Sequence, residues 1–156
     1  MELTRIYDHI HPLACEAWEI YEQSFPLAER RPLAEHLRAL HDPAFHYHLL
    51  TDRERLVGLL SWWEWESADG TAFRFGEHFA IAPDRRSGGY GSLALEFLKG
   101  DDQRIVLLEI DPPVDEISQR RERFYQRNGL VTNPEYDHVH PSFRSETLPH
   151  RLLIMS

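Results

Sequence analysis

The stretch from Phe73 to Leu98 constrains the fold of this chain more than any other part of its sequence. It begins with alternating apolar residues, which predict a strand, and Pro83 ends that strand because proline lacks a ladder N–H group. A turn from Arg85 to Gly91 follows, with two arginines and three glycines. Apolar residues then recur at helical spacing, so the free N–H groups of a first helical turn should face the glycines. Free amides beside two arginines favour a site for a phosphate group.

Two phosphate-binding patterns fit this turn unequally. A P-loop requires a lysine and then Ser or Thr after its last glycine, and Gly91 is followed by Ser92 and Leu93, so that pattern is excluded. The segment from Gly89 to Ala94 does match the dinucleotide pattern G-x-G-x-x-A, and Glu109 lies about 20 residues further on. The rest of the chain is too short for the further βα units of a dinucleotide domain. A nucleotide-dependent enzyme therefore stays the weaker alternative.

Size and charge limit the functions that are open to the chain. With 156 residues, of which 42% are hydrophobic, it is predicted to form a single domain over residues 1–156. The formal net charge of −9 argues against binding of nucleic acid and favours attraction of a cationic small molecule. The sequence shows no long apolar run and no signal-like N-terminus, so we expect no membrane association and a cytoplasmic location. We expect a monomer or a homodimer.

The remaining periodicity predicts a mixed α/β fold. Two helices should lie between a first short strand and a three-stranded antiparallel meander. The next strand is reached through a helix, so it should run parallel to the last strand of that meander. The expected strands cover residues 2–8, 45–49, 56–65, 73–82, 104–110, 130–131, 136–139 and 151–155, and the expected long helices start near Pro12, Pro32, Gly91 and Glu116.

Two motifs resemble signatures of the GNAT (GCN5-related N-acetyltransferase) family. The segment from Arg86 to Gly91 resembles the family's pyrophosphate loop, and the segment from Tyr125 to Leu130 resembles its second signature, a tyrosine followed by three residues and a glycine. Leu130 stands where phenylalanine is common in the family. The resemblance implies an α/β (α+β) GNAT-like fold with a mixed, mostly antiparallel central sheet, parallel fourth and fifth strands, and flanking helices. It also implies an acyl-CoA-dependent N-acyltransferase with acetyl-CoA as cosubstrate.

The same resemblance implies which residues hold the coenzyme and protonate its thiolate. The pyrophosphate would rest on amides of the loop, and the pantetheine arm would pair with the fourth strand like an added strand. The implied coenzyme-binding residues are Phe79, Ala80, Ile81, Arg85, Arg86, Ser87, Gly88, Gly89, Tyr90, Gly91 and Ser92. Tyr125 takes the role of general acid, because a tyrosine with a pKa near ~10 can donate a proton to a thiolate at neutral pH. A packing role is the alternative for Tyr125.

The attacking amine also needs a base that removes its proton. Glu77 and Glu109 interrupt the apolar pattern of two neighbouring strands, and partial burial is expected to raise their pKa values into a useful range. Glu77 is the first choice, because the family often places a glutamate in its fourth strand, and Glu109 is the second. Alternation places His78 on the opposite face of the strand from Glu77. A structural carboxylate at a strand bulge is the alternative for either residue.

Ten histidines raise the question of a metal site. Alternation puts both rings of His46 and His48 on one face of a strand, and the same holds for His138 and His140. Two ligands do not make a site, and the chain lacks an HExxH motif and a cysteine pair. We therefore predict no metal.

The predicted activity is direct transfer of the acetyl group from acetyl-CoA to a primary amine of a small or cationic acceptor. The walls of the acceptor pocket are expected at residues 25–31, 62–66 and 133–142. The sequence does not identify the acceptor. The alternative function is a non-catalytic domain that binds or senses acyl-CoA.

Overall fold

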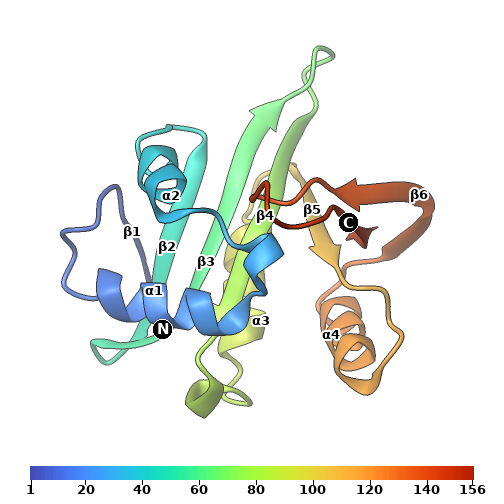
Figure 1. Cartoon of the computed structure of the whole chain (residues 1–156). Helices are drawn as coiled ribbons and strands as arrows, with labels where there is room; N and C mark the ends of the chain where they lie inside the picture. Colours follow the sequence, from blue (N-terminus) through green and yellow to red (C-terminus); the bar gives the residue numbers. More distant parts are fainter.

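The computed structural model describes residues 1–156 and contains one seven-stranded sheet with four α-helices (Figure 1). The elements in chain order are β1 (Glu2–Arg5), α1 (Ala14–Ser24), the 3₁₀ turn η1 (Leu27–Glu29), α2 (Leu33–Ala39), β2 (Phe45–Asp52), β3 (Arg55–Glu66), β4 (Ala72–Ile81), the 3₁₀ turn η2 (Pro83–Arg85), α3 (Tyr90–Lys99), β5 (Ile105–Ile110), α4 (Glu116–Arg127), β6 (Thr132–His140) and β7 (His150–Met155). The strand order is β1-β2-β3-β4-β5-β7-β6, and only β4 and β5 pair in parallel. The predicted mixed, mostly antiparallel sheet with parallel fourth and fifth strands is confirmed.

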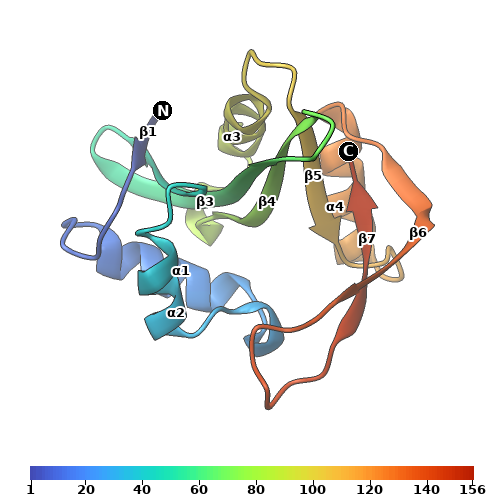
Figure 2. The same cartoon turned by 90° about the horizontal axis from the view of Figure 1, so that it is seen from above.

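Helices cover both faces of the sheet (Figure 2). The helices α1 and α2 lie on one face, over a buried cluster that includes Tyr21, Phe45 and Leu59. The helices α3 and α4 lie on the other face, over a second cluster that includes Leu60 and Leu95. Leu59 and Leu60 are neighbours in β3 but belong to opposite clusters, because successive side chains of a strand point to opposite faces. The apolar run of β3 is therefore the centre of the molecule.

The parallel strands β4 and β5 stay together over only part of their length. Their pairing runs from Phe73 with Ile105 to Gly76 with Leu108, and it ends there. Gly76 allows the close approach at this last pair, because a Cβ atom at that position would lie 2.3 Å from a methyl group of Leu108. Beyond Gly76 one edge of β4 has no strand beside it.

A β-bulge in β4 lies at Glu77, which the alternation pattern did not predict. Ser61 of β3 pairs with His78, and the next residue, Trp62, pairs with Gly76, so Glu77 is left without a partner. Both Glu77 and His78 consequently point to the face that α1 and α2 cover. The prediction that His78 lies on the opposite face from Glu77 is therefore wrong.

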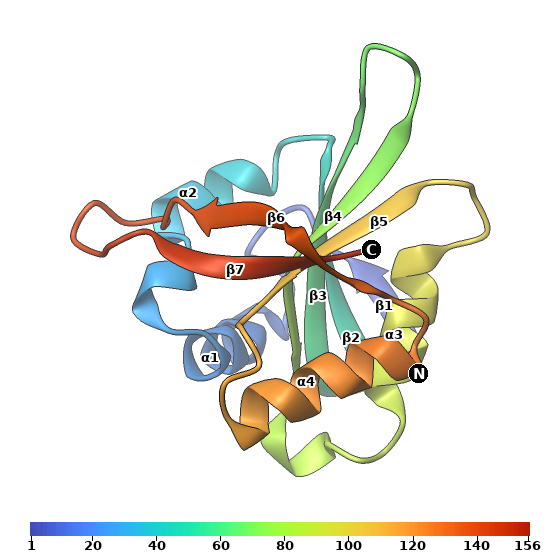
Figure 3. The ribbon, with the colours of Figure 1, turned by 90° about the vertical axis from the view of Figure 1, so that its right-hand side faces the viewer.

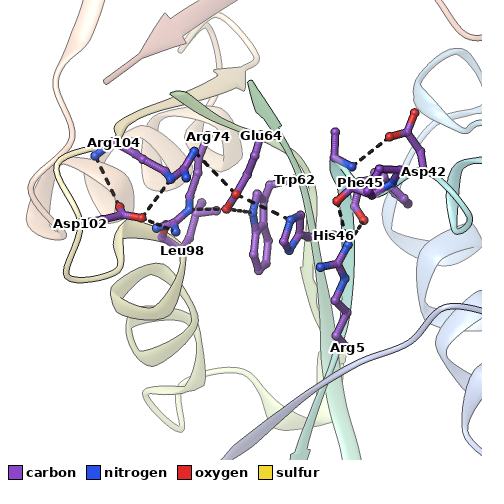
Figure 4. A network of polar contacts seen from close by, with 12 residues as sticks. Arg5, Asp42, Phe45, His46, Trp62, Glu64, Arg74, Leu98, Asp102 and Arg104 are labelled. Atoms are coloured by element: carbon purple, nitrogen blue, oxygen red, sulfur yellow. Dashed lines mark hydrogen bonds and ion pairs between the residues drawn. The ribbon is translucent and has the colours of Figure 1, made fainter. Parts of the chain in front are cut away.

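Arg74 ties β4 to the C-terminal end of α3 (Figure 4). Its guanidinium group contacts Glu64 and Asp102, each at 2.8 Å, and donates to the carbonyl oxygens of Leu98 and Lys99 at 3.2 Å. These carbonyls belong to the last helical turn, where backbone acceptors lack partners and a cation is favourable. The glycine-rich turn lies at the other, N-terminal end of the same helix.

The histidines of β2 pack against an aromatic ring. The ring centroids of His46 and His48 lie 4.9 and 4.5 Å from that of Trp62, with nearly parallel planes. Figure 4 shows the His46 ring beside the Trp62 ring, and its Nε2 atom lies 3.8 Å from the Glu64 carboxylate. Burial lowers the pKa of His48 to about 3, so this ring stays neutral at physiological pH.

The hairpin of β6 and β7 reaches back toward the α1–α2 layer (Figure 3). Its connecting loop bonds to the segment around η1, since Phe143 N–H and the Ser142 hydroxyl both donate to the carbonyl of Ala28. The strand β6 is one irregular strand where the sequence predicted two short ones, and Leu130 and Val131 precede it. The strand β1 ends at Arg5, earlier than predicted. No helix is both long enough and apolar enough to cross a membrane.

Candidate active site

A cavity of about 800 Å³ opens where β4 and β5 separate. Its walls come from β4, the turn before α3, the end of β5, α4, the end of β6 and the segment after α1. The predicted site residues among its lining are Glu77, Phe79, Ala80, Ile81, Arg85, Arg86, Ser87, Gly89, Tyr90, Gly91, Ser92, Glu109 and Tyr125. Gly88, which lies in the same turn, is the one predicted site residue that is not part of this lining.

The turn before α3 presents a run of unpaired backbone donors. The seven N–H groups from Arg86 to Ser92 donate to no acceptor in the protein, and the first helical bond is from Leu93 to the carbonyl of Gly89. Ser87 and Gly89 adopt positive φ angles of 69° and 79°, which bend the chain into this turn. An array of free amides at a helix N-terminus suits an anionic group, and binding of a phosphate at this turn stays a prediction.

Side chains hold this turn in place. The Tyr90 hydroxyl donates to the Asp52 carboxylate at 2.8 Å, which ties the turn to the end of β2. A Cβ atom on Gly91 would lie 3.0 Å from the Phe124 ring, so a glycine here lets the start of α3 approach α4 closely. Gly88 is also restricted, because its Cβ atom would lie 2.9 Å from the Tyr90 ring.

The open edge of β4 exposes peptide groups to the cavity. Ala82 N–H bonds to Val57 of β3, and the direction of hydrogen bonding alternates along a strand. The N–H and C=O groups of Phe79 and Ile81 therefore face away from β3, toward the missing strand. Arg86 already uses one of these groups, because its Nε donates to the Ile81 carbonyl at 3.2 Å. An extended ligand could pair with this edge as an added strand.

Tyr125 lies on α4, facing the sheet across the cavity. The residue is 8% exposed, and no protein group forms a hydrogen bond with its hydroxyl. Burial raises the pKa of Tyr125 to about 12, so its hydroxyl keeps its proton throughout the neutral range. The side chain thus places a protonated, unbonded hydroxyl on the cavity wall.

Glu77 is held by a dense set of contacts. Its Oε1 atom contacts the Arg31 guanidinium group and accepts from the Trp63 indole at 3.0 Å, and Oε2 lies 3.3 Å from His78 Nδ1. Burial alone would raise the pKa of Glu77, but these contacts outweigh it and hold that pKa below its ordinary value. The expectation of a raised pKa is wrong for this residue. Oε2 remains buried without a hydrogen-bond partner.

Glu109 lies between two histidines of β6. Its Oε1 atom bonds to His138 Nε2, and its Oε2 atom lies 3.2 Å from His140 Nδ1. Burial opposes ionisation of Glu109, but the two histidines outweigh burial and lower its pKa, so the predicted increase is wrong here as well. His138 and His140 therefore hold a carboxylate, on the one strand face that alternation predicted for them.

Four acidic residues line the cavity. Glu29 of η1 and Asp111 after β5 join Glu77 and Glu109 in its lining. Burial raises the pKa of Glu29, with a further increase from the nearby Asp111 charge. The glycine-rich turn thus offers arginines and free amides to an anionic group, and the other walls carry four carboxylates, of which Asp111 is paired with Arg121.

Two of the three predicted pocket segments contribute less than expected, and one contributes nothing. No residue from Trp62 to Glu66 lines the cavity: Trp62 packs beneath α3 and Trp63 contacts Arg31. Of residues 133–142 only His140 lines it, and of residues 25–31 Phe25, Pro26 and Glu29 do. Apart from Tyr125, the wall formed by α4 was not predicted from the sequence. The lining residues of that helix are Ile117, Arg120, Arg121, Phe124, Tyr125 and Arg127, and their helical spacing was the available signal.

Known proteins resemble this chain in sequence motif and in fold. A search of curated proteins finds no match. The structure superposes on that of a protein from Bacteroides thetaiotaomicron assigned to the GNAT acetyltransferase family, with a TM-score of 0.83, 31% identity, and coverage of 99% of this chain and 85% of the other. The fold is shared with a spermidine N-acetyltransferase chimera that includes the Vibrio cholerae enzyme (TM-score 0.67, 15% identity, coverage 99% and 95%). It is also shared with an aminoglycoside 6'-N-acetyltransferase in complex with coenzyme A (TM-score 0.67, 14% identity, coverage 100% and 96%).

A family model decides the assignment. The model of the acetyltransferase (GNAT) family matches residues 10–130, which include the glycine-rich turn, the open edge of β4 and Tyr125. The match spans more than half of the chain and agrees with the shared fold. The chain therefore belongs to the acetyltransferase (GNAT) family of enzymes.

Proposed function

We propose that this enzyme transfers the acetyl group of acetyl-CoA directly to a primary amine of a small, cationic acceptor. The observation that carries the proposal is the run of seven unpaired N–H groups from Arg86 to Ser92, placed beside the open edge of β4. All the cavity walls come from elements of one sheet and its helices, which supports a single functional domain over residues 1–156.

The coenzyme would bind along the turn and the strand. Its pyrophosphate would accept from the free amides, with Arg85 and Arg86 adding positive charge. Its pantetheine arm would pair with the peptide groups of Phe79 and Ile81, and it would compete with Arg86 for the Ile81 carbonyl. The proposed coenzyme-binding residues are Phe79, Ala80, Ile81, Arg85, Arg86, Ser87, Gly88, Gly89, Tyr90, Gly91 and Ser92.

The chemistry requires an acid and a base on the cavity wall. The acceptor nitrogen attacks the thioester carbon, and the departing thiolate takes a proton from Tyr125, whose hydroxyl is protonated and unbonded. Glu77 and Glu109 are the candidate bases, acting directly or through water. Their lowered pKa values keep both ionised at neutral pH. No nucleophilic side chain is needed, so both substrates would be bound at once.

Charge in the cavity supports a cationic acceptor. Glu29, Glu77, Glu109 and Asp111 line the cavity, and none of them belongs to the glycine-rich turn. Two proteins that share the fold are named for acetylation of spermidine and of aminoglycosides, both of which are polyamines. A primary ammonium group would gain from these carboxylates, whereas an anionic acceptor would be repelled.

Calorimetric titration with acetyl-CoA tests coenzyme binding. Gly89→Asp adds bulk and negative charge at a positive-φ residue of the turn, and it should weaken binding by roughly tenfold or more. Gly70→Asp is the matched control, because Gly70 has a φ angle of 84° and an equally open surrounding but lies in the β3–β4 turn outside the cavity. Normal affinity of Gly89→Asp would show that the turn does not hold the coenzyme.

Thiol release from acetyl-CoA tests the transfer itself. Wild-type protein should release CoA when a polyamine or another primary amine is added, and not with amines that are already acetylated. Acetyl-CoA should also stabilise the fold, by about 2.7 kcal/mol at 100 times Kd. Binding without turnover across a broad panel of amines would refute the proposed activity while leaving the coenzyme site intact.

A further inference from the structure

His140 is a buried histidine in the cavity wall whose two ring nitrogens have different surroundings. The residue is 8% exposed and lies at the end of β6. Its Nδ1 atom lies 3.2 Å from the Glu109 carboxylate, whereas its Nε2 atom is buried and has no hydrogen-bond partner in the protein. An unpartnered buried nitrogen is costly unless a ligand or a water uses it.

The contact with Glu109 decides which nitrogen carries the hydrogen. A carboxylate only accepts, so the nitrogen that faces it must donate, and in a neutral imidazole the other nitrogen then holds a lone pair. The hydrogen of neutral His140 is therefore on Nδ1, and Nε2 is the basic atom. His138 contacts the other oxygen of Glu109 and fixes that carboxylate from the opposite side.

We propose that His140 is the general base of the acetyl transfer and that Glu109 is a positioning residue that fixes its tautomer. The inference rests on the proposed function and assigns the base within the same cavity. Nε2 takes one proton from the acceptor ammonium group, directly or through one water, and the freed amine nitrogen forms a bond to the thioester carbon. The C–S bond breaks, the thiolate takes the Tyr125 proton, and the second proton of the nitrogen returns to the tyrosine oxygen through solvent. The proton on His140 leaves to solvent, so the sum is amide, CoA thiol and one proton.

The alternative base, Glu77, is less available. One of its oxygens is shared by Arg31 and Trp63, and the other faces His78. If Glu77 took a proton from the acceptor, its buried ion pair with Arg31, in which the Glu77 side chain is only 7% exposed, would be disrupted. His140 can accept a proton while its contact with Glu109 becomes stronger, because the imidazolium ion faces a carboxylate.

The charged groups around His140 favour this role. Glu109 faces it from β5, Glu77 from β4 and Glu29 from η1, while His150 of β7 has its ring centroid 5.4 Å away and His138 touches the far side of Glu109. The contact with Glu109 raises the pKa of His140, burial opposes this, and the charges of Glu29 and Glu77 add to the increase. A base whose pKa lies above the ordinary histidine value still titrates within the range in which enzymes operate.

The pH profile of kcat/KM tests the inference against a matched control. His140→Gln should lower kcat/KM at pH 7 by ~10²-fold or more with unchanged affinity for acetyl-CoA, because the base is lost. His46→Gln changes a histidine of β2 that packs on Trp62 and does not line the cavity, and it should stay within about threefold of the wild type. Glu109→Gln removes a charge that raises the pKa of His140, so the acid limb of the kcat/KM profile of this variant should lie at lower pH than that of the wild type. Wild-type rates in His140→Gln, or an unmoved acid limb in Glu109→Gln, would overturn the proposal.

A spectroscopic measurement keeps the proposal testable even if His140→Gln fails to fold. Two-bond ¹⁵N–¹H correlation spectra of wild-type protein report the tautomer of each imidazole. The His140 signals should show hydrogen on Nδ1 and a free Nε2, and hydrogen on Nε2 would overturn the inference. If the proposed function is wrong, the wild-type enzyme acetylates no amine, and the assignment of His140 as base is then refuted as well. If the wild type and His140→Gln turn over at the same rate, only the assignment of His140 as base is refuted.

Discussion

Replacement of Tyr125 by phenylalanine removes one hydroxyl from the cavity wall and nothing else. The hydroxyl has no hydrogen-bond partner in the protein, so its loss leaves no donor or acceptor unsatisfied. The ring and its packing beside Leu130 and Leu108 in the core under α3 and α4 remain. The free energy of unfolding should therefore change by less than about 0.5 kcal/mol.

The kinetic effect should be much larger than the effect on stability. Loss of a general acid lowers the rate by ~10²-fold or more, which corresponds to about 2.7 kcal/mol of transition-state stabilisation. The assay is CoA release at saturating acetyl-CoA with an amine that the wild type acetylates, so that binding and chemistry are separated. Coenzyme affinity should stay within about twofold.

Tyr21→Phe supplies a matched comparison. The Tyr21 hydroxyl accepts from Arg31 N–H at 2.7 Å and contacts His78 Nε2 at 3.2 Å, and it does not line the cavity. Removing it leaves a buried donor without a partner, so this variant should lose about 1–3 kcal/mol of stability. Full activity of Tyr125→Phe together with a lowered melting temperature would refute the acid assignment and show a hydroxyl that serves only packing.

Further substitutions test the side chains that hold parts of the site in place. Glu77→Gln leaves the Arg31 guanidinium group buried without its partner and should lower the free energy of unfolding at pH 7 by about 3–5 kcal/mol in urea titrations. Burial opposes ionisation of Glu77, but its contacts outweigh burial and lower its pKa, so the stability that the ion pair contributes is present above the ordinary carboxyl pKa of about 4.3. This contribution is lost as the pH falls through the lower pKa of the folded state. The free energies of unfolding of the wild type and Glu77→Gln should therefore converge in acid, and a constant difference between them at all pH values would contradict the reasoning. Tyr90→Phe should weaken acetyl-CoA binding by at most about tenfold, because the turn loses its tie to Asp52. Asp52→Asn should weaken it similarly, and a double variant with additive losses would show that the two side chains act separately.

The glycine-rich turn could be predicted from the sequence because its conformation depends on local backbone. Pro83 ends the strand, Gly89 supplies a positive φ angle, and the following helix leaves its first amides unpaired. All three effects act within a few residues of the chain. The same holds for Tyr125, whose place on α4 follows from helical periodicity once the helix is located.

The acid–base groups could not be predicted in this way, because their pKa values depend on partners that are remote in sequence. Glu77 meets Arg31 and Glu109 meets His140, and in each case only the fold brings the pair together. Burial by itself would have raised both carboxyl pKa values, which is what the apolar neighbours in sequence indicated. The groups that reverse the shift are His78, which the bulge turns to the same face as Glu77, Arg31 in the segment before α2, and the two histidines of β6. No local pattern reveals that these groups meet the two carboxylates.

The β-bulge at Glu77 connects the two halves of the site. A regular strand would place Phe75, Glu77 and Phe79 on one face, but Phe75 pairs with Trp63 toward α1 while Phe79 packs toward α3. One extra residue thus reverses the face of every later side chain in β4, and pairing with β5 ends at the residue just before it. The bulge leaves Glu77 and His78 on the side of the cavity proposed for the acceptor, and the unpaired edge beyond it faces the side proposed for the coenzyme. Deletion of Glu77 would restore a regular strand, and it should therefore disturb coenzyme binding and acceptor binding together.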